Sequence, residues 1–415
     1  MKLHWTASVA LLAFFAWSPV THAADDARPG AIRIGRAADW PTVPQTGAEA
    51  EQVKKTLAQI KLPAGFHISL YALVPGARHI AVGPKGTATF VGTRQSKVWV
   101  VTKRPQGGGE EVREFAPTVP KKIPNGVCFA QDGTLYIAEV NRVLAYADAE
   151  SFETRTDSVL FPAVKQGELI PKAEESFNHA TRVCRIGPDN KLYIQLGQPY
   201  NVPPKHKLEV YRKWGIGGIV RIDRDGSHRE VYATGMRNPV GMDFNPKDGS
   251  LWSNDNQVDL MGDDRPPGEM NRITERGRDY GFPWYGGGHT RTNEYKNDTP
   301  PPNLIFPEVE QVAHAADLGL TFYTGTMFPQ KYRGAIFSTQ HGSWNRTVPV
   351  GARVMVTFLN EDGRAAGKSE PFAEGWNNHG HYLGRPVDVA QLPDGSLLVS
   401  DDRVGALYRI WYDGK

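Results

Sequence analysis

The chain has 415 residues, of which 22% are charged, and its formal net charge is +3. Like charges do not gather in blocks, so the composition disfavours binding to nucleic acid or to an acidic membrane surface. The 43 glycines, 31 prolines and 10% aromatic residues are typical of many short strands joined by tight turns.

The first residues have the pattern of an export signal, which we place at residues 1–23. Lys2 and His4 precede an apolar run over residues 7–17, and residues 21–23 form a small-residue cleavage site. This run is shorter than the ~20 apolar residues that a membrane anchor needs. We therefore expect a periplasmic or secreted protein without stable membrane insertion.

Residues 24–62 form a lead-in segment that contains prolines, with a short helix predicted over residues 48–59. The apolar stretch that begins at His67 predicts a strand. We expect this strand to complete the last unit of the repeat described next and so to close a ring.

An internal repeat runs through the rest of the chain. A turn carrying Gly or Asn is followed at once by an apolar strand, with copies starting at Lys85, Asp132, Asp189, Asp248, Arg333 and Asp394. A second β-type run follows each copy and starts at Lys97, Arg142, Gly218, Glu269, Arg353 and Ala406. Most copies begin about 45 to 60 residues apart, which is the length of a four-stranded blade. The sequence predicts an all-β, six-bladed β-propeller over residues 63–415.

The spacing between the fourth and fifth copies is longer than the others. The excess, residues 258–307, is rich in Gly, Pro, Asp and Asn. We interpret it as loops over one face of the propeller.

The two cysteines, Cys128 and Cys184, lie at similar points of two repeat units. A disulfide between them and two buried free thiols are both consistent with the sequence, which does not give the distance between their Cα atoms. A CxxCH motif is absent, which argues against covalently attached c-type haem.

Polar clusters flank several of the repeats. Because the innermost strands of a propeller converge on one axis, side chains in the adjoining loops can meet around one ligand. The clusters are Asn178-His179 with Arg182, Arg237-Asn238, Asp255-Asn256-Gln257, residues 341–346 and Arg385.

Three stretches carry a family resemblance: residues 179–193, 235–284 and 332–346. They resemble the pyrroloquinoline quinone (PQQ) dependent sugar dehydrogenases of the sorbosone and soluble glucose dehydrogenase type. The likeness extends over most of the chain from about residue 65 onward, whereas any one short motif would be weak evidence.

The resemblance implies catalytic roles for His179 and Arg237. His179 matches the general base that takes the proton of the sugar hydroxyl, and histidine can accept a proton near neutral pH. Arg237, with Asn238, matches the pair that contacts the quinone, where the arginine stabilises developing negative charge. A lone histidine or arginine more often has a structural role, and the placement within these blocks favours the catalytic one.

The resemblance also implies which residues hold the cofactor. PQQ carries three carboxylates, which planar guanidinium groups bind well. Arg346 and Arg385 match basic cofactor ligands, and Gln257 is a further cofactor contact. Arg182 is either a cofactor ligand or a structural neighbour of His179.

Calcium is the metal that the resemblance implies, bound in part by the backbone carbonyls of Asn256 and Gln257. The nearby Asp259, Asp263 and Asp264 predict either a second, structural calcium site or a solvated acidic loop.

The chain also departs from its relatives. Residues 123–126 read Ile-Pro-Asn-Gly, where soluble glucose dehydrogenases have a glutamine before Asn-Gly. A second basic residue that the glucose-specific relatives have near the position of Val387 is missing. We therefore expect this chain to hold the cofactor carboxylates in a different way.

These expectations together predict an enzyme that oxidises a sugar or sugar aldehyde by hydride transfer to PQQ. The partners would be a small sugar and a periplasmic electron acceptor such as a cytochrome or a quinone. The alternatives are a calcium-dependent lactonase, which needs inward carboxylates on several blades, and a non-catalytic binding propeller. No GxGxxG motif follows a strand and opens a helix, which disfavours nicotinamide use.

Overall fold

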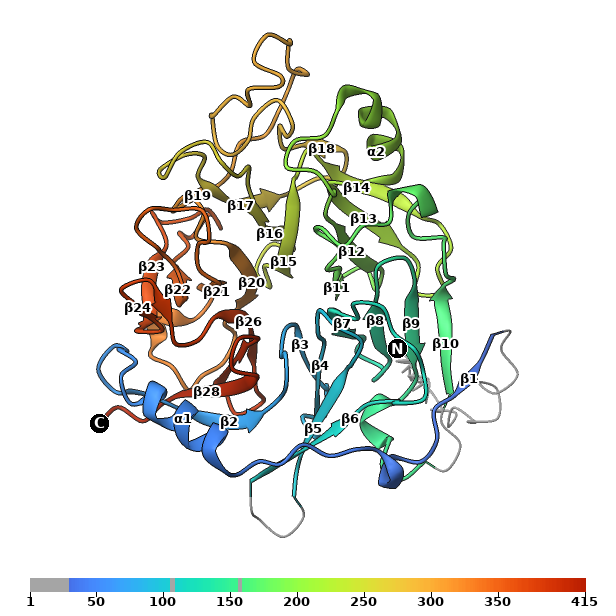
Figure 1. Cartoon of the computed structure of the whole chain (residues 1–415), viewed down its shortest axis with the longest axis vertical. Coiled ribbons are helices and arrows are strands. Elements are labelled where there is room, and N and C mark those ends of the chain that lie inside the picture. Colours follow the sequence, from blue (N-terminus) through green and yellow to red (C-terminus); the bar gives the residue numbers. More distant parts are fainter. Residues whose placement is uncertain (1–29, 105–108, 156–158) are drawn as a thin grey trace, which may run out of the picture.

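The computed structural model describes residues 30–104, 109–155 and 159–415, and the predicted export signal lies outside these residues. Six sheets stand around one axis, each with its first strand innermost (Figure 1). The predicted six-bladed β-propeller is therefore confirmed. No helix in the described parts of the chain has the length and apolar character needed to cross a bilayer.

Each blade consists of four strands, which we name from the axis outward. Blade 1 has β3 (Ile80–Val82), β4 (Ala88–Val91), β5 (Trp99–Lys103) and β6 (Glu110–Glu114). Blade 2 has β7 (Gly126–Phe129), β8 (Leu135–Ala138), β9 (Val143–Tyr146) and β10 (Val159–Val164). Blade 3 has β11 (Val183–Ile186), β12 (Leu192–Leu196), β13 (Gly218–Ile222) and β14 (Glu230–Thr234).

The other three blades have the same order. Blade 4 has β15 (Asn238–Phe244), β16 (Leu251–Asn256), β17 (Gly268–Ile273) and β19 (Val309–Gln311). Blade 5 has β20 (Asp317–Phe322), β21 (Ile336–Gln340), β22 (Arg353–Thr357) and β23 (Glu370–Glu374). Blade 6 has β26 (Pro386–Gln391), β27 (Leu397–Asp401), β28 (Ala406–Tyr412) and β2 (Phe66–Leu73).

A few short elements lie outside this scheme. β1 (Ile32–Arg33) adds to β10, β18 (Arg278–Asp279) adds to β14, and β24 (Asn377–Asn378) pairs with β25 (His381–Tyr382). The helices are α1 (Ala48–Leu57) and α2 (Leu208–Trp214), with single 3₁₀ turns at Ala37–Asp39, Ala149–Ser151, Lys172–Glu174, Lys205–Lys207 and Gln330–Tyr332. The helix predicted over residues 48–59 is confirmed, whereas α2 has no counterpart among the predicted elements.

The predicted repeat corresponds to the second and third strands of every blade. Each Gly-containing or Asn-containing turn leads into the second strand, and each later β-type run is the third. The strand at His67 is also confirmed, because β2 pairs antiparallel with β28 from Phe66↔Tyr412 to Leu73↔Ala406. An early strand thus completes the last blade and closes the ring.

The hydrophobic core is divided into layers between neighbouring blades. One cluster of buried side chains fills each of the six interfaces; Phe90 and Leu135 lie between blades 1 and 2, for example, and Met242 and Ile219 between blades 3 and 4. Burial of these side chains supplies most of the drive for the blades to pack together.

Residues 30–62 of the lead-in segment run along the outer rim of the ring (Figure 1). Isolated bridges join Thr42 to Arg113 in blade 1 and Lys61 to Glu374 in blade 5. Trp40 stacks on Phe152, with ring centroids 5.5 Å apart. The segment therefore contributes to the core from outside the blades.

Neighbouring blades are also joined by a row of buried hydrogen bonds, which we call the polar belt. In blades 3 to 6, the residue six positions after the start of the repeat donates to a carbonyl that lies in, or just before, the inner strand of the next blade. The bonds are Gln195 Nε2 to Gly241 O (3.1 Å), Asn254 Nδ2 to Leu318 O (2.8 Å), Thr339 Oγ1 to Val387 O (2.6 Å) and Ser400 Oγ to Arg78 O (2.6 Å). In blades 1 and 2 the same position holds Val91 and Ala138, which have no side-chain donor.

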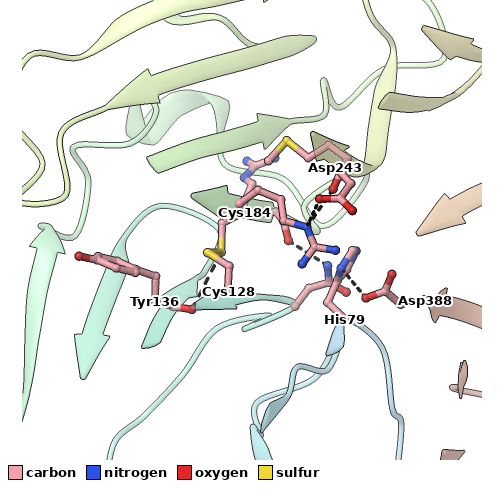
Figure 2. The surroundings of a disulfide bond; sticks show 10 residues. His79, Cys128, Tyr136, Cys184, Asp243 and Asp388 are labelled. Carbon is pink, nitrogen blue, oxygen red and sulfur yellow. Dashed lines mark hydrogen bonds and ion pairs between the residues drawn. A yellow bond between two sulfur atoms is a disulfide. The ribbon is translucent and has the colours of Figure 1, made fainter. Parts of the chain in front are cut away.

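Blades 2 and 3 are joined covalently. Cys128 on β7 and Cys184 on β11 form a disulfide, with their Cα atoms 5.7 Å apart (Figure 2). Of the two states that the sequence allowed, free thiols are therefore wrong. The inner strands of adjacent blades bring the cysteines within the separation that a disulfide spans.

A buried imidazole connects three further inner strands. His79 Nδ1 lies 3.1 Å from Asp388 Oδ2 in blade 6, and His79 Nε2 lies 3.3 Å from the carbonyl of Val240 in blade 4. Figure 2 shows His79 and Asp388 facing each other across the inner strands. This contact and the polar belt fix the inner strands, and the functional side chains lie in the loops that lead into these strands.

Candidate active site

A cavity of about 220 Å³ lies at one end of the propeller axis. Its lining residues lie near the start of a first strand or near the end of a second strand. These two places are at the same end of a blade, because its first and second strands are antiparallel. Five predicted site residues line it: His179, Arg237, Asn238, Asn256 and Gln257. The structure therefore brings together residues from blades 3 and 4 that are up to 78 positions apart in the sequence.

His179 lies in the loop before β11 and is half-buried. Its Nδ1 lies 2.5 Å from the carbonyl oxygen of Gln198. Because a carbonyl only accepts, Nδ1 carries the proton, and Nε2 of the neutral ring has a free lone pair. The backbone of His179 has a left-handed φ of 49°, an uncommon conformation that clusters at functional sites.

The surroundings of His179 favour its neutral form. Burial, followed by the charge of Arg237, lowers the pKa of His179 to about 3. The imidazole therefore remains unprotonated throughout the neutral and mildly acidic range.

Arg237 is held rigidly, with 4% of its side chain exposed. Its guanidinium donates to Asp259 Oδ2 at 2.8 Å, to Asn201 Oδ1 at 2.8 Å and to the carbonyl of Asn256 at 3.3 Å. An arginine fixed in this way is a preorganised positive charge beside His179.

The buried carboxylate of Asp255 positions the Arg237-Asn238 segment. Its Oδ2 accepts from the backbone N–H of Arg237 at 3.0 Å, and its Oδ1 accepts from that of Asn238 at 2.7 Å. Gln257 Nε2 donates to the same carboxylate at 2.7 Å. Asp255 therefore holds the Arg237-Asn238 segment and Gln257 in place, a role that the sequence did not indicate.

Three of the predicted cofactor ligands do not line the cavity. Arg346 donates to Asp264 at 2.9 Å and to the carbonyl of Val348, and Arg385 donates to the carbonyls of His341 and Gly342. Arg182 donates to the carbonyls of Val140, His179 and Gly197. These contacts agree with the alternative that Arg182 is a structural neighbour of His179.

Of the predicted calcium ligands, Asn256 ends the second strand of blade 4 and Gln257 follows it, and both line the cavity. Gln257 Oε1 is buried and has no hydrogen-bond partner among the described residues. An unpaired oxygen of this kind suits a hard cation. Among residues 30–104, 109–155 and 159–415, no three His, Cys, Asp or Glu side chains cluster as a metal site would require.

The acidic loop after β16 is engaged by basic and polar neighbours. Asp259 pairs with Arg237, Asp264 with Arg346, and Asp263 accepts from the backbone N–H of Thr347 at 3.1 Å. The contacts of Asp263 and Asp264 tie a loop of blade 4 to a loop of blade 5, and a second calcium site stays a prediction.

Sequence reasoning missed two arginines of blade 1 that line the cavity, Arg78 and Arg94. Arg78 donates to Asp402 and, through Nε, to Asn125 Oδ1 at 2.8 Å. Asp402 in turn contacts Nε2 of His341 at 2.7 Å, and His341 also lines the cavity. The signal that could have found the arginines is their place beside the first copy of the repeat, at the end where the other polar clusters lie.

Comparison with known proteins agrees with this architecture. The family model for glucose/sorbosone dehydrogenase matches residues 80–409. An uncharacterised protein of Borreliella burgdorferi is 30% identical over 374 residues, which cover 88% of this chain and 93% of that protein.

Two solved structures share the fold. The calcium structure of a Trichoderma reesei carbohydrate-active enzyme of family AA12 has a TM-score of 0.67 at 20% identity and covers 86% of this chain and 97% of its own. The holo form of the pyranose dehydrogenase PQQ domain from Coprinopsis cinerea has a TM-score of 0.66 at 18% identity and covers 85% and 97%.

Proposed function

Because the chain belongs to the glucose/sorbosone dehydrogenase family, we propose that it oxidises a sugar or sugar aldehyde with PQQ as hydride acceptor. The observation that carries the proposal is the pairing of an unprotonated His179 Nε2 with a rigid Arg237 in one cavity. Electrons would then pass to a periplasmic acceptor, a cytochrome or a quinone.

The residues around the cavity fit an anionic quinone and a calcium ion. The guanidinium groups of Arg78, Arg94 and Arg237 line it, and they suit the carboxylates of PQQ. The unpaired oxygen of Gln257 and the carbonyl of Asn256 suit calcium. When bound, PQQ supplies the two-electron acceptor that the protein side chains lack.

His179 and Arg237 would then divide the protein's part of the chemistry. Nε2 of His179 would accept the proton of the sugar hydroxyl while hydride leaves the carbon that bears this hydroxyl. Arg237 stabilises the negative charge that develops beside it, and its bonds to Asn201 and Asp259 prevent it from turning away. Asn238 is fixed next to it by Asp255.

The disulfide and the sequence of residues 1–23 both support export. Disulfides persist mainly in oxidising compartments outside the cytosol, and the N-terminal pattern predicts a cleaved signal. Cell fractionation with a tagged chain tests this part of the proposal: recovery in the cytosol with an intact N-terminus would contradict it.

Dye-linked oxidation tests the catalytic proposal. We expect the purified protein to reduce a dye when PQQ, calcium and an aldose are present, and to stop when calcium is chelated. His179→Ala should lose at least about 100-fold in kcat, since a general base contributes on the order of 10²–10⁴. His228→Ala is the matched control, because His228 is exposed and does not line the cavity.

Two outcomes would contradict the proposal. Equal turnover by the His179→Ala variant would remove the assigned base. Hydrolysis of a lactone by a protein that binds no PQQ would favour the calcium-dependent lactonase instead.

A further inference from the structure

The charges that line the cavity are not all balanced. Arg78 is paired with Asp402, and Arg237 with Asp259. Arg94, which also lines the cavity, forms no hydrogen bond or ion pair with any described residue. In the described parts of the chain its positive charge therefore has no direct ion pair, and the carboxylate that acts on it electrostatically, Asp402, already contacts Arg78 and His341.

The backbone around Arg94 is held in place, although its guanidinium is not. Its neighbours on either side are anchored: the N–H of Thr93 donates to Pro124 O at 3.2 Å, and the carbonyl of Gln95 accepts from the N–H of Ile123 at 2.9 Å. Thr93 Oγ1 also donates to the carbonyl of Lys97 at 2.7 Å across the turn. The loop after β4 thus presents one free guanidinium at the cavity from a rigid support.

Arg94 is exposed, so its guanidinium is open to a ligand that enters the cavity. Partial desolvation, followed by the neighbouring charge of Arg78, lowers the pKa of Arg94. A bound anion offsets both effects, because it neutralises the charge and replaces lost water as hydrogen-bond acceptor.

We propose that Arg94 binds a carboxylate of the cofactor, so that the cofactor is held in part from blade 1. This inference rests on the proposed function and concerns a residue to which the family resemblance assigned no role. The planar guanidinium fork matches a carboxylate in two parallel hydrogen bonds. A neutral sugar has no carboxylate to offer, so the anion is assigned to the cofactor. Arg346 and Arg385 already donate to protein carbonyls, which leaves Arg94 as the better candidate to bind it.

Direct PQQ binding tests the inference without turnover. It is measured on the calcium-loaded protein by the quenching of tryptophan fluorescence. We expect Arg94→Gln to raise the Kd for PQQ by about 10-fold or more, as befits loss of a charge-assisted pair. Arg94→Lys should recover part of that loss. Arg403→Gln is the matched control, since Arg403 is exposed and does not line the cavity.

The arms separate the ways in which the inference can fail. If PQQ binds the wild type and Arg94→Gln equally well, the inference is wrong and the proposed function stands. If Arg94→Gln binds PQQ normally but loses turnover of a uronic acid and keeps that of the neutral aldose, the carboxylate belongs to the substrate, which also overturns it. If the wild type itself binds no PQQ, the proposed function fails and the inference with it.

Discussion

Two parts of the ring join their blades by different means. Blades 3 to 6 donate side-chain hydrogen bonds from the polar belt to a carbonyl in, or just before, the inner strand of the next blade. Blades 1 and 2 have Val91 and Ala138 at the equivalent position, and the disulfide joins blade 2 to blade 3 instead. The repeat position six residues after the start of the turn therefore does not need a side-chain donor in every blade.

The two means of connection meet at the candidate site. His179 enters the strand that carries Cys184, whereas Arg237 enters the strand whose Gly241 carbonyl accepts from Gln195. The proposed base and the proposed electrostatic partner are therefore supported by different kinds of bond. Removing the disulfide and a belt hydrogen bond separately shows which of the two connections His179 and Arg237 depend on.

The largest effect is expected from removal of the disulfide. The double variant Cys128→Ser/Cys184→Ser should lose about 4 kcal/mol of unfolding free energy, from the entropy of a loop with a sequence separation of 56 residues. Denaturant unfolding of the wild type with and without a reducing agent gives the same comparison. An unchanged midpoint after complete reduction would show that the disulfide adds nothing to the stability of blades 2 and 3.

A belt residue should matter less. Asn254→Leu keeps the approximate volume but leaves the buried Leu318 carbonyl without its donor, which costs about 1–3 kcal/mol. If the two means of connection act independently, this loss adds to that of the disulfide variant within about 0.5 kcal/mol. A strongly non-additive triple variant would mean that the ring distributes strain between the two parts.

Gly197 lies where the two parts meet, and Gly197→Ala should affect activity more than stability. A Cβ there would lie 2.5 Å from Asn238 Oδ1 and 2.7 Å from the carbonyl of His179. Displacing both by fractions of an ångström should lower kcat/KM by about 10-fold, the order that small misplacements cost. Gly249→Ala is a control of position, because nothing lies near its Cβ, although its φ of 72° adds strain.

The smallest change is expected on acidification. Because the pKa of His179 is lowered to about 3, the base stays unprotonated as the pH falls through 6.5. The value of kcat/KM at pH 5 should therefore stay within about 2-fold of that at pH 7.5, whereas a histidine with an ordinary pKa would lose about 30-fold. Arg237→Gln removes one of the causes and should move the acid limb to higher pH; an acid limb near pH 6.5 in the wild type would contradict the assignment.

The sequence predicted the fold well because each blade repeats a turn, a strand and a second strand with local signals. It also brought His179, Arg237 and Asn238 to one cavity, since loops at equivalent repeat positions must meet at the axis. It did not find Arg94, because a lone arginine in a loop carries no pattern. It left the pairing of Cys128 with Cys184 open, because the distance between two blades is set by packing.

The pairing of β2 with β28 has a further consequence for how the molecule opens. In a linear array of repeats the two end units each have one neighbour and fray first. In this ring the strands that complete blade 6 are separated in the sequence by residues 74–405, so the circle has no end unit. Hydrogen exchange in blade 6 should be as slow as in blade 3, because neither blade can unfold locally before the closed ring opens.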